Sequence, residues 1–167
     1  MNNQIHINIA ELKKIASGLV NGQQVFLTGN IYTARDAAHK RLLEMIRNKQ
    51  KLPINVKKSV IYYCGPTPAP PGMLIGSCGP TSSYRMDAYL LPLLKMGLAG
   101  MIGKGQRSQE ATEAIKKYNA SYFMAIGGAG ALACKYVKDV DEVAFVDLGC
   151  ESIKKLYVED FPVIAVV

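Results

Sequence analysis

The sequence predicts a single α/β domain with a mixed central sheet and helices packed against it. The chain has 167 residues, of which 49% are hydrophobic, so it can form one sizeable core. Segments with strand character alternate with segments of helical character, and this alternation is typical of α/β folds. We therefore expect one domain over residues 1–167.

The first third of the chain carries helix and strand signals on either side of a turn at Asn21-Gly22. Apolar residues with helical spacing, Ala38, Leu42 and Met45, predict a helix. A run rich in β-branched and aromatic residues follows it and predicts a strand. We expect helices at residues 10–17 and 34–48 and strands at residues 24–28 and 56–63.

Residues 65–79 are rich in proline and glycine, which predicts a long loop, and loops of this length are often functional. A helix over residues 83–95, kinked or restarted at Pro92, is expected to stop at Gly97. Ser108 can cap a helix that runs to Tyr118. The remaining pattern predicts a helix at residues 129–137 and strands at residues 98–102, 121–126, 142–147, 154–158 and 163–167.

Charge and hydropathy favour a cytoplasmic protein without a membrane or nucleic-acid partner. No apolar run reaches 18 residues, and the start of the chain lacks the pattern of a secretory signal. The net charge is +7. We interpret the basic residues as a solvated helix face and its trailing loop, because no RNA-binding motif or aromatic platform accompanies them. Part of the excess charge lies in Lys40, Arg41, Arg47, Lys49, Lys51, Lys57 and Lys58.

The chain has four cysteines: Cys64, Cys78, Cys134 and Cys150. Their spacing matches no zinc or ferredoxin pattern, and an apolar chain of this length does not need disulfides. We therefore expect reduced, partly buried thiols. Cys64 is a candidate nucleophile, but neither His6 nor His39 has an evident reason to lie beside it, so a structural thiol is favoured.

A first candidate binding site lies where the second expected helix begins. Thr33 and Asp36 have the spacing of a capping box. The N-terminus of a helix carries unpaired N–H groups and partial positive charge. Arg35 adds a cation there, so we interpret the segment as a site where a guanidinium and backbone N–H groups bind one carboxylate. The alternative is a surface Arg35 paired with Asp36.

A second candidate site follows the long loop. A Gly-Pro turn delivers three hydroxyl groups and then Arg85 into the start of a helix, whereas an ordinary N-cap needs only one hydroxyl. The hydroxyl groups belong to Thr81, Ser82 and Ser83. A third candidate is Gly103-Lys104-Gly105, whose glycines allow close approach to a ligand and whose lysine supplies a charge. A plain turn is the alternative there.

Residues 128–133 fit the G-x-G-x-x-[GA] pattern of a dinucleotide-binding turn. They follow an expected strand and open an expected helix, and Asp147 ends the next expected strand. Against this interpretation, the segment comes late in the chain, and glycine with alanine also serves tight packing. A dinucleotide-binding domain that uses Gly128-Ala129-Gly130 therefore remains the alternative function.

Several of these segments occur together in the order seen in one family. They are IYTARDAAHKRL (residues 31–42), YCGPTP (63–68), GPTSSYRMD (79–87) and GKG (103–105), followed by residues 127–130 and VDLGCE (146–151). The chain resembles the C-terminal-type domain of class I fumarate hydratases, which also forms the beta subunit of L-tartrate dehydratases. The resemblance covers nearly the whole chain.

The resemblance implies a swivelling β/β/α domain of an iron–sulfur hydro-lyase, which works only with a partner subunit in an α₂β₂ arrangement. The [4Fe–4S] cluster would be bound by three cysteines of that alpha subunit, and its free iron would act as a Lewis acid. Arg35, Arg85 and Lys104 match the residues that bind the carboxylates of a small dicarboxylate substrate. Thr81, with Ser82 beside it, matches the catalytic hydroxyl pair, and Thr81 matches the suggested base.

The implied reaction also suits the residues themselves. Three cations at positive helix ends could hold both carboxylates of a diacid, with fumarate and (S)-malate the first candidates and L-tartrate the next. Removing water needs a base for the C–H proton. An alcohol such as Thr81 is a weak base, so it needs neighbours that stabilise its deprotonated form.

Overall fold

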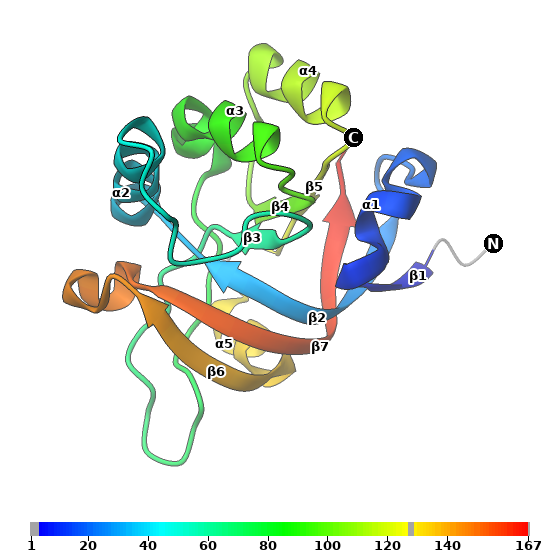
Figure 1. Ribbon diagram of the computed structural model, residues 1–167. Coiled ribbons are helices and arrows are strands. Elements are labelled where there is room, and N and C mark those ends of the chain that lie inside the picture. Colours follow the sequence, from blue (N-terminus) through cyan, green and yellow to red (C-terminus); the bar gives the residue numbers. More distant parts are fainter. Residues whose placement is uncertain (1–3, 127–128, 167) are drawn as a thin grey trace.

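The computed structural model describes residues 4–126 and 129–166, and the predicted α/β fold with a mixed sheet is confirmed (Figure 1). The strands follow the sheet order β1-β2-β3-β4-β5-β7-β6. They are β1 (Gln4–Asn8), β2 (Gln24–Thr33), β3 (Val60–Tyr62), β4 (Gly100–Gly103), β5 (Ser121–Met124), β6 (Val137–Ala144) and β7 (Ile153–Ala165). The α-helices are α1 (Leu12–Ile15), α2 (Asp36–Arg47), α3 (Asp87–Lys95), α4 (Gln109–Lys117) and α5 (Gly130–Ala133). Short 3₁₀ helices span Ile9–Glu11, Ala16–Gly18, Ser83–Met86, Cys134–Tyr136 and Val146–Glu151.

Strands β1 to β5 are parallel neighbours, whereas β7 runs antiparallel to β2, β5 and β6. Because β7 pairs with both β2 and β5, the sheet curls until β2, β3, β4, β5 and β7 form a closed ring of paired strands. The parallel strands β2, β3 and β4 therefore end at one common edge, from which the candidate site residues follow.

The molecule has a helix layer and two sheet layers, the order that the resemblance implied. Helices α2, α3 and α4 cover one face of β3, β4 and β5, and the curved β1-β2-β7-β6 part of the sheet lies on the other (Figure 1). Side chains of a strand alternate between its faces. On β3, Val60 and Tyr62 pack toward β2 and β7, while Ile61 and the following Tyr63 pack beneath the helices. The central strands are thus buried on both faces.

The strand predicted at residues 142–147 is wrong. The strand here, β6, covers Val137–Ala144, and Val146–Glu151 is a 3₁₀ helix that begins after Phe145, a residue with a left-handed φ of 56°. The apolar residues that suggested a strand do not all face a core, since Val146 is 63% exposed. Among the described strands, β6 pairs only with β7, and its charged residues are exposed, so it has little apolar alternation.

The two strands predicted for the tail are one long strand, β7, and β1 was not predicted. Within β7, Asp160 takes a positive φ of 49°, and its N–H donates to Thr28 Oγ1 at 3.0 Å. The pairing register of β2 and β7 shifts at this point, between Leu27 and Gly29. This local irregularity lets β7 continue through residues 159–162, which separated the two predicted strands.

The helix predictions are confirmed in position but not in length. Ser108 caps α4 as expected, because its Oγ accepts from the Ala111 N–H at 3.1 Å. Helix α3 runs through Pro92 without a break and follows a 3₁₀ turn. The predicted helix at residues 129–137 is a single α turn, α5, followed by a 3₁₀ turn.

The dinucleotide-binding alternative lacks its structural context. Gly127 and Gly128 lie outside the described residues. The strand after α5, β6, pairs antiparallel with β7 and lies away from β5, so β5, α5 and β6 form no parallel βαβ unit. Asp147 lies in a 3₁₀ helix, where its carboxylate is paired with Arg41.

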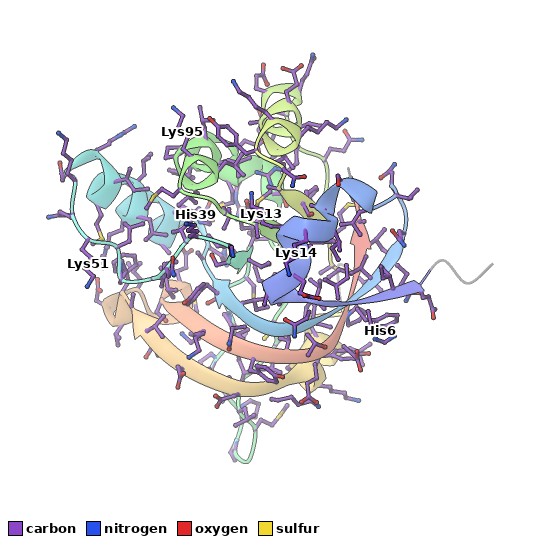
Figure 2. The ribbon with its side chains drawn as sticks, turned by 45° about the vertical axis from the view of Figure 1, so that its right-hand side comes forward. His6, Lys13, Lys14, His39, Lys51 and Lys95 are labelled. Atoms are coloured by element: carbon purple, nitrogen blue, oxygen red, sulfur yellow. The ribbon has the colours of Figure 1, made fainter. Side chains whose placement is uncertain are left out.

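The expected solvated basic face is confirmed, since most of the basic residues named above are exposed and Lys51 and Lys95 point outward in Figure 2. Arg41 is half-buried and binds Asp147 through two contacts of 2.8 Å. Among the described residues, no helix has both the length and the apolar character needed to cross a membrane.

Candidate functional site

The ends of β2, β3 and β4 bring the predicted site residues to one edge of the sheet. Arg35 follows β2, Lys104 follows β4, and the segment after the long loop returns between them. The Thr81 N–H donates to Tyr63 O at 2.7 Å, and the Ala34 N–H donates to Tyr62 O at 3.0 Å. Side chains that follow the carboxyl ends of parallel strands commonly form binding sites in α/β folds.

Backbone hydrogen bonds fix the hydroxyl segment beside Lys104. Ser82 and Lys104 form a parallel β-bridge, in which the Ser83 N–H donates to Lys104 O at 2.9 Å and the Lys104 N–H donates to Thr81 O at 3.3 Å. The Ser82 and Lys104 side chains are exposed, whereas Thr81 is half-buried. The structure therefore brings Thr81, Ser82 and Lys104 together.

Glycine at position 103 allows this close approach. A Cβ there would lie 2.0 Å from Ser83 Oγ and 2.8 Å from the Tyr63 ring. Gly103 therefore serves contact between two segments of the chain rather than contact with a ligand. Gly105 has a positive φ of 78°, which favours glycine at the turn that follows Lys104.

Arg85 joins Thr81 to the start of α2. Its Nε and Nη2 atoms each donate to the Asp36 carboxylate at 3.0 Å. Nη2 also donates to Thr81 Oγ1 at 2.6 Å. A guanidinium that donates to a hydroxyl oxygen stabilises the deprotonated form of that oxygen, so Arg85 is a neighbour of the kind that Thr81 needs.

The capping box predicted from Thr33 and Asp36 is wrong. Thr33 is the last residue of β2 and is fully buried, and its Oγ1 donates to Ser152 O and accepts from the Lys154 N–H. Asp36 instead binds Arg85. The alternative interpretation, a pairing of Arg35 with Asp36, is only a loose contact, with 3.9 Å between Arg35 Nε and Asp36 Oδ2.

The N-terminus of α2 already holds a carboxylate of this chain. Glu151 Oε2 accepts from the Ala37 N–H at 2.8 Å, and Glu151 Oε1 lies 3.8 Å from Arg35 Nη2. We expected a ligand carboxylate at this place, and Glu151 was not predicted, although VDLGCE is among the segments that resemble the family. The carboxylate position expected at the start of α2 is therefore occupied by Glu151 in this structure.

Arg35 is held against the backbone by Gly65. A Cβ on Gly65 would lie 2.9 Å from Arg35 Cδ. The Arg35 Nε is buried and has no hydrogen-bond partner, while the side chain as a whole is 30% exposed. The side chain of Arg35 is thus partly exposed at the edge of the sheet, although its Nε is not.

A buried ion pair supports the site from behind. Asp87 Oδ1 accepts from Arg107 Nε at 2.5 Å, and Oδ2 accepts from the Ser108 N–H at 2.8 Å.

The Tyr122 hydroxyl donates to Gly105 O at 2.6 Å and lies 2.9 Å from Ser83 Oγ. Burial raises the pKa of Tyr122, so this hydroxyl stays protonated and fixes both segments that flank the site.

His39 belongs to α2, and its buried ring packs against Tyr89 of α3 inside the helix layer (Figure 2). Its Nδ1 donates to Arg35 O at 2.8 Å, and its ring packs against Tyr63 and Tyr89. Burial lowers the pKa of His39 to about 4, so the imidazole is neutral at pH 7. The histidine supports the turn that presents Arg35 and has no direct access to a ligand.

The cysteines are free thiols, as expected, and all but Cys150 are buried. The hydrogen bond between Cys64 and Cys78, together with burial, raises the pKa of Cys64, which favours the structural role over the nucleophile. Within residues 4–126 and 129–166, no three His, Cys, Asp or Glu side chains are grouped to hold a metal ion. This part of the chain therefore offers no ligand set for an iron–sulfur cluster.

The comparisons with known proteins agree with the resemblance. A sequence model of the family described as Fumarase C-terminus matches residues 1–167. The chain is 42% identical over 148 residues to Fumarate hydratase 2 of Leishmania major, covering 87% of this chain and 26% of that protein. It is 44% identical over 138 residues to Fumarate hydratase class I, anaerobic, of Escherichia coli (strain K12), covering 81% of this chain and 25% of that protein.

A relative of similar length also matches. The chain is 37% identical over 154 residues to the Putative L(+)-tartrate dehydratase subunit beta of Methanocaldococcus jannaschii, covering 89% of this chain and 79% of that protein. The chain thus spans about a quarter of the length of the fumarate hydratases and most of the length of this subunit.

Proposed function

The chain belongs to the Fumarase C-terminus family, and from this premise we propose that it is the substrate-binding part of a hydro-lyase. The enzyme adds water to, or removes it from, a small dicarboxylate. Fumarate and (S)-malate are the first candidates, because several relatives are named fumarate hydratases, and L-tartrate is the next. The match to the beta-subunit relative supports the proposal, because it extends over 89% of this chain and 79% of that protein.

The observation that carries the proposal is the gathering of cations and hydroxyls at one open edge of the sheet. Arg35, Arg85 and Lys104 supply positive charge for two carboxylates, and Arg85 still has its Nη1 group free of the contacts described above. Thr81 and Ser82 lie among them. A diacid bound there would have one of its carbons beside the Thr81 hydroxyl, whose deprotonated form the Arg85 guanidinium stabilises.

In the dehydration direction, the deprotonated oxygen of Thr81 takes a proton from the carbon next to the one that bears the hydroxyl. The electron pair of that C–H bond forms the double bond, and the hydroxyl group leaves as water after receiving a proton from an acid of the partner. Ser82 contributes a second hydroxyl at the same edge. The contact from Arg85 to Thr81 Oγ1 supports this role, because it favours the oxygen without its proton.

The [4Fe–4S] cluster is proposed to belong to a partner subunit of the alpha type. The described residues of this chain do not fit it: Cys64, Cys78 and Cys134 are buried thiols, and no group of three metal-ligating side chains lies among those residues. The name of the beta-subunit relative supports the existence of a partner. We propose an α₂β₂ assembly in which the partner covers the exposed edge with Ser82, Arg85 and Lys104.

The proposal is tested by co-expressing the chain with its cluster-bearing partner and assaying the anaerobic complex on fumarate, (S)-malate, L-tartrate and methylated relatives. We expect reversible hydration of at least one of these acids. A complex with an intact cluster spectrum that turns over none of them would contradict the proposed function.

A further inference from the structure

Three of the five N–H donors of Arg85 bind other side chains of the chain. A guanidinium has five N–H groups in a rigid plane. The Nε hydrogen and one Nη2 hydrogen bind the two oxygens of Asp36, each at 3.0 Å. The other Nη2 hydrogen binds Thr81 Oγ1 at 2.6 Å. Only the two Nη1 hydrogens remain. A bidentate contact with a carboxylate uses N–H groups of two different nitrogens, so Arg85 cannot form one with a substrate while it keeps these contacts.

We propose that Asp36 is a positioning residue, which holds the Arg85 guanidinium in the orientation that directs Nη2 at the Thr81 oxygen. This inference rests on the proposed function, in which Thr81 is the base. Asp36 takes the Nε–Nη2 edge of Arg85 and thereby fixes the plane of the group, and the remaining Nη2 hydrogen points at Thr81. Arg85 then serves the base first and a substrate carboxylate second, through Nη1.

The surroundings of Asp36 support positioning over a role in stability. The Asp36 and Arg85 side chains are 39% and 46% exposed, and exposed ion pairs contribute little to folding. Asp36 also lies in the first turn of α2, where a carboxylate suits the helix dipole. Its carboxylate faces the turn that carries Thr81 instead of capping that helix, since the Ala37 N–H is bound by Glu151.

Helix α2 offers a matched control in its pair between Arg41 and Asp147. This pair also has two Arg–Asp contacts, each of 2.8 Å, and joins α2 to another segment of the chain. None of the hydrogen bonds of Arg41 and Asp147 described above involves a proposed site residue. Asp147→Asn therefore removes a similar pair from the same helix without changing the orientation of Arg85.

A double-mutant cycle in the co-expressed complex tests the proposal. In the wild-type background, Asp36→Asn should lower kcat by about 10- to 100-fold while KM changes by less than about 3-fold, because a stabilising donor is misdirected. In the Thr81→Ala background the same substitution should lower kcat by less than about 3-fold, because the oxygen that it serves is absent. Asp147→Asn should leave kcat near the wild-type value in both backgrounds.

Two kinetic results would overturn the inference. One is an equal loss of kcat from Asp36→Asn in both backgrounds, which means that Asp36 acts independently of Thr81. The other is a large rise in KM with unchanged kcat, which means that Asp36 only prepares Arg85 to bind substrate.

A crystal structure of the full chain with Asp36→Asn separates this inference from the proposed function, because it needs no activity. We expect Arg85 Nη2 to have left Thr81 Oγ1, and an unchanged contact would overturn the inference. A wild-type complex that turns over no diacid would contradict the proposed function but not this inference. The contact between Arg85 and Thr81 in the variant crystal structure would still decide whether Asp36 positions Arg85.

Discussion

At the scale of single residues, Thr81 is the side chain on which the proposed chemistry depends. Its oxygen receives a hydrogen bond from a cation, and its backbone is fixed by Tyr63 and Lys104. The side chain caps no helix, since the 3₁₀ helix that follows begins after Ser82. The hydroxyl is therefore free for chemistry.

Thr81→Ala in the complex should lower kcat by about 10²- to 10⁴-fold with little change in KM, because it removes the base and no charge. Thr81→Ser keeps the hydroxyl and should retain part of the activity. Steady-state kinetics with the cluster content measured in parallel check this. A near-normal kcat in Thr81→Ala would remove Thr81 as the base.

Arg35→Lys keeps a positive charge but loses the planar donor that lies against Gly65. We expect kcat/KM to fall by about 30- to 1000-fold, chiefly through KM, if Arg35 binds a carboxylate equally in the ground and transition states. Arg41→Lys, within α2 but outside the site, is the control and should keep wild-type kinetics. Equal kinetics in both variants would show that Arg35 does not bind substrate.

His39 makes a pH-dependent contribution to stability. Burial lowers the pKa of His39 from 6.5 to about 4. Between these two pH values the imidazole is protonated in the unfolded chain and neutral in the folded chain. Stability from this group is present above pH 6.5 and is lost as the pH falls toward 4, by about 3 kcal/mol in all. Imidazole NMR should show His39 neutral at pH 5.5, and a protonated ring at that pH would contradict the burial argument.

At the scale of elements, the approach of β4 to the hydroxyl segment depends on the absence of a side chain at Gly103. Gly103→Ala forces a Cβ into Ser83 Oγ and the Tyr63 ring. We expect a loss of about 1–3 kcal/mol of unfolding free energy, measured in urea, together with lower activity of the complex. Gly18→Ala is the control, because nothing lies within 4 Å of its added Cβ. Equal stability of the two variants would contradict the close approach.

The elements also explain what the sequence could predict. Strands β3 to β5 are buried on both faces and helices α2 and α4 have clear apolar faces, so their positions followed from the pattern of apolar residues. Strand β6 is an exposed edge with charged side chains, and β7 contains a left-handed residue, Asp160. The predicted strand for β6 therefore began too late, and β7 was predicted as two strands with a gap around Asp160.

The same limit applies to the candidate site. Arg35, Thr81, Arg85 and Lys104 stood out because a cation or hydroxyl beside glycine or a helix start is a local signal. The contacts of Asp36 with Arg85 and of Glu151 with Ala37 join residues 49 and 114 positions apart. Such pairings depend on the closed sheet, and a single sequence does not reveal them.

At the scale of the whole molecule, the proposed substrate edge is complete in its cations and hydroxyls but open to solvent. The described residues supply no group of metal ligands, and the beta-subunit relative is named as one part of a larger enzyme. We propose that this chain supplies the substrate-binding edge and that a separate, cluster-bearing partner completes the site. Activity should require both parts.

The most direct measurement is an anaerobic titration of the purified chain into its reconstituted partner, with fumarate hydration as the readout. Neither protein alone should turn over fumarate, and activity should rise to a plateau at equal amounts of the two. The Thr81→Ala chain should bind the partner equally well but restore little activity. Full activity of the partner alone, or of this chain alone after reconstitution with iron and sulfide, would contradict the account.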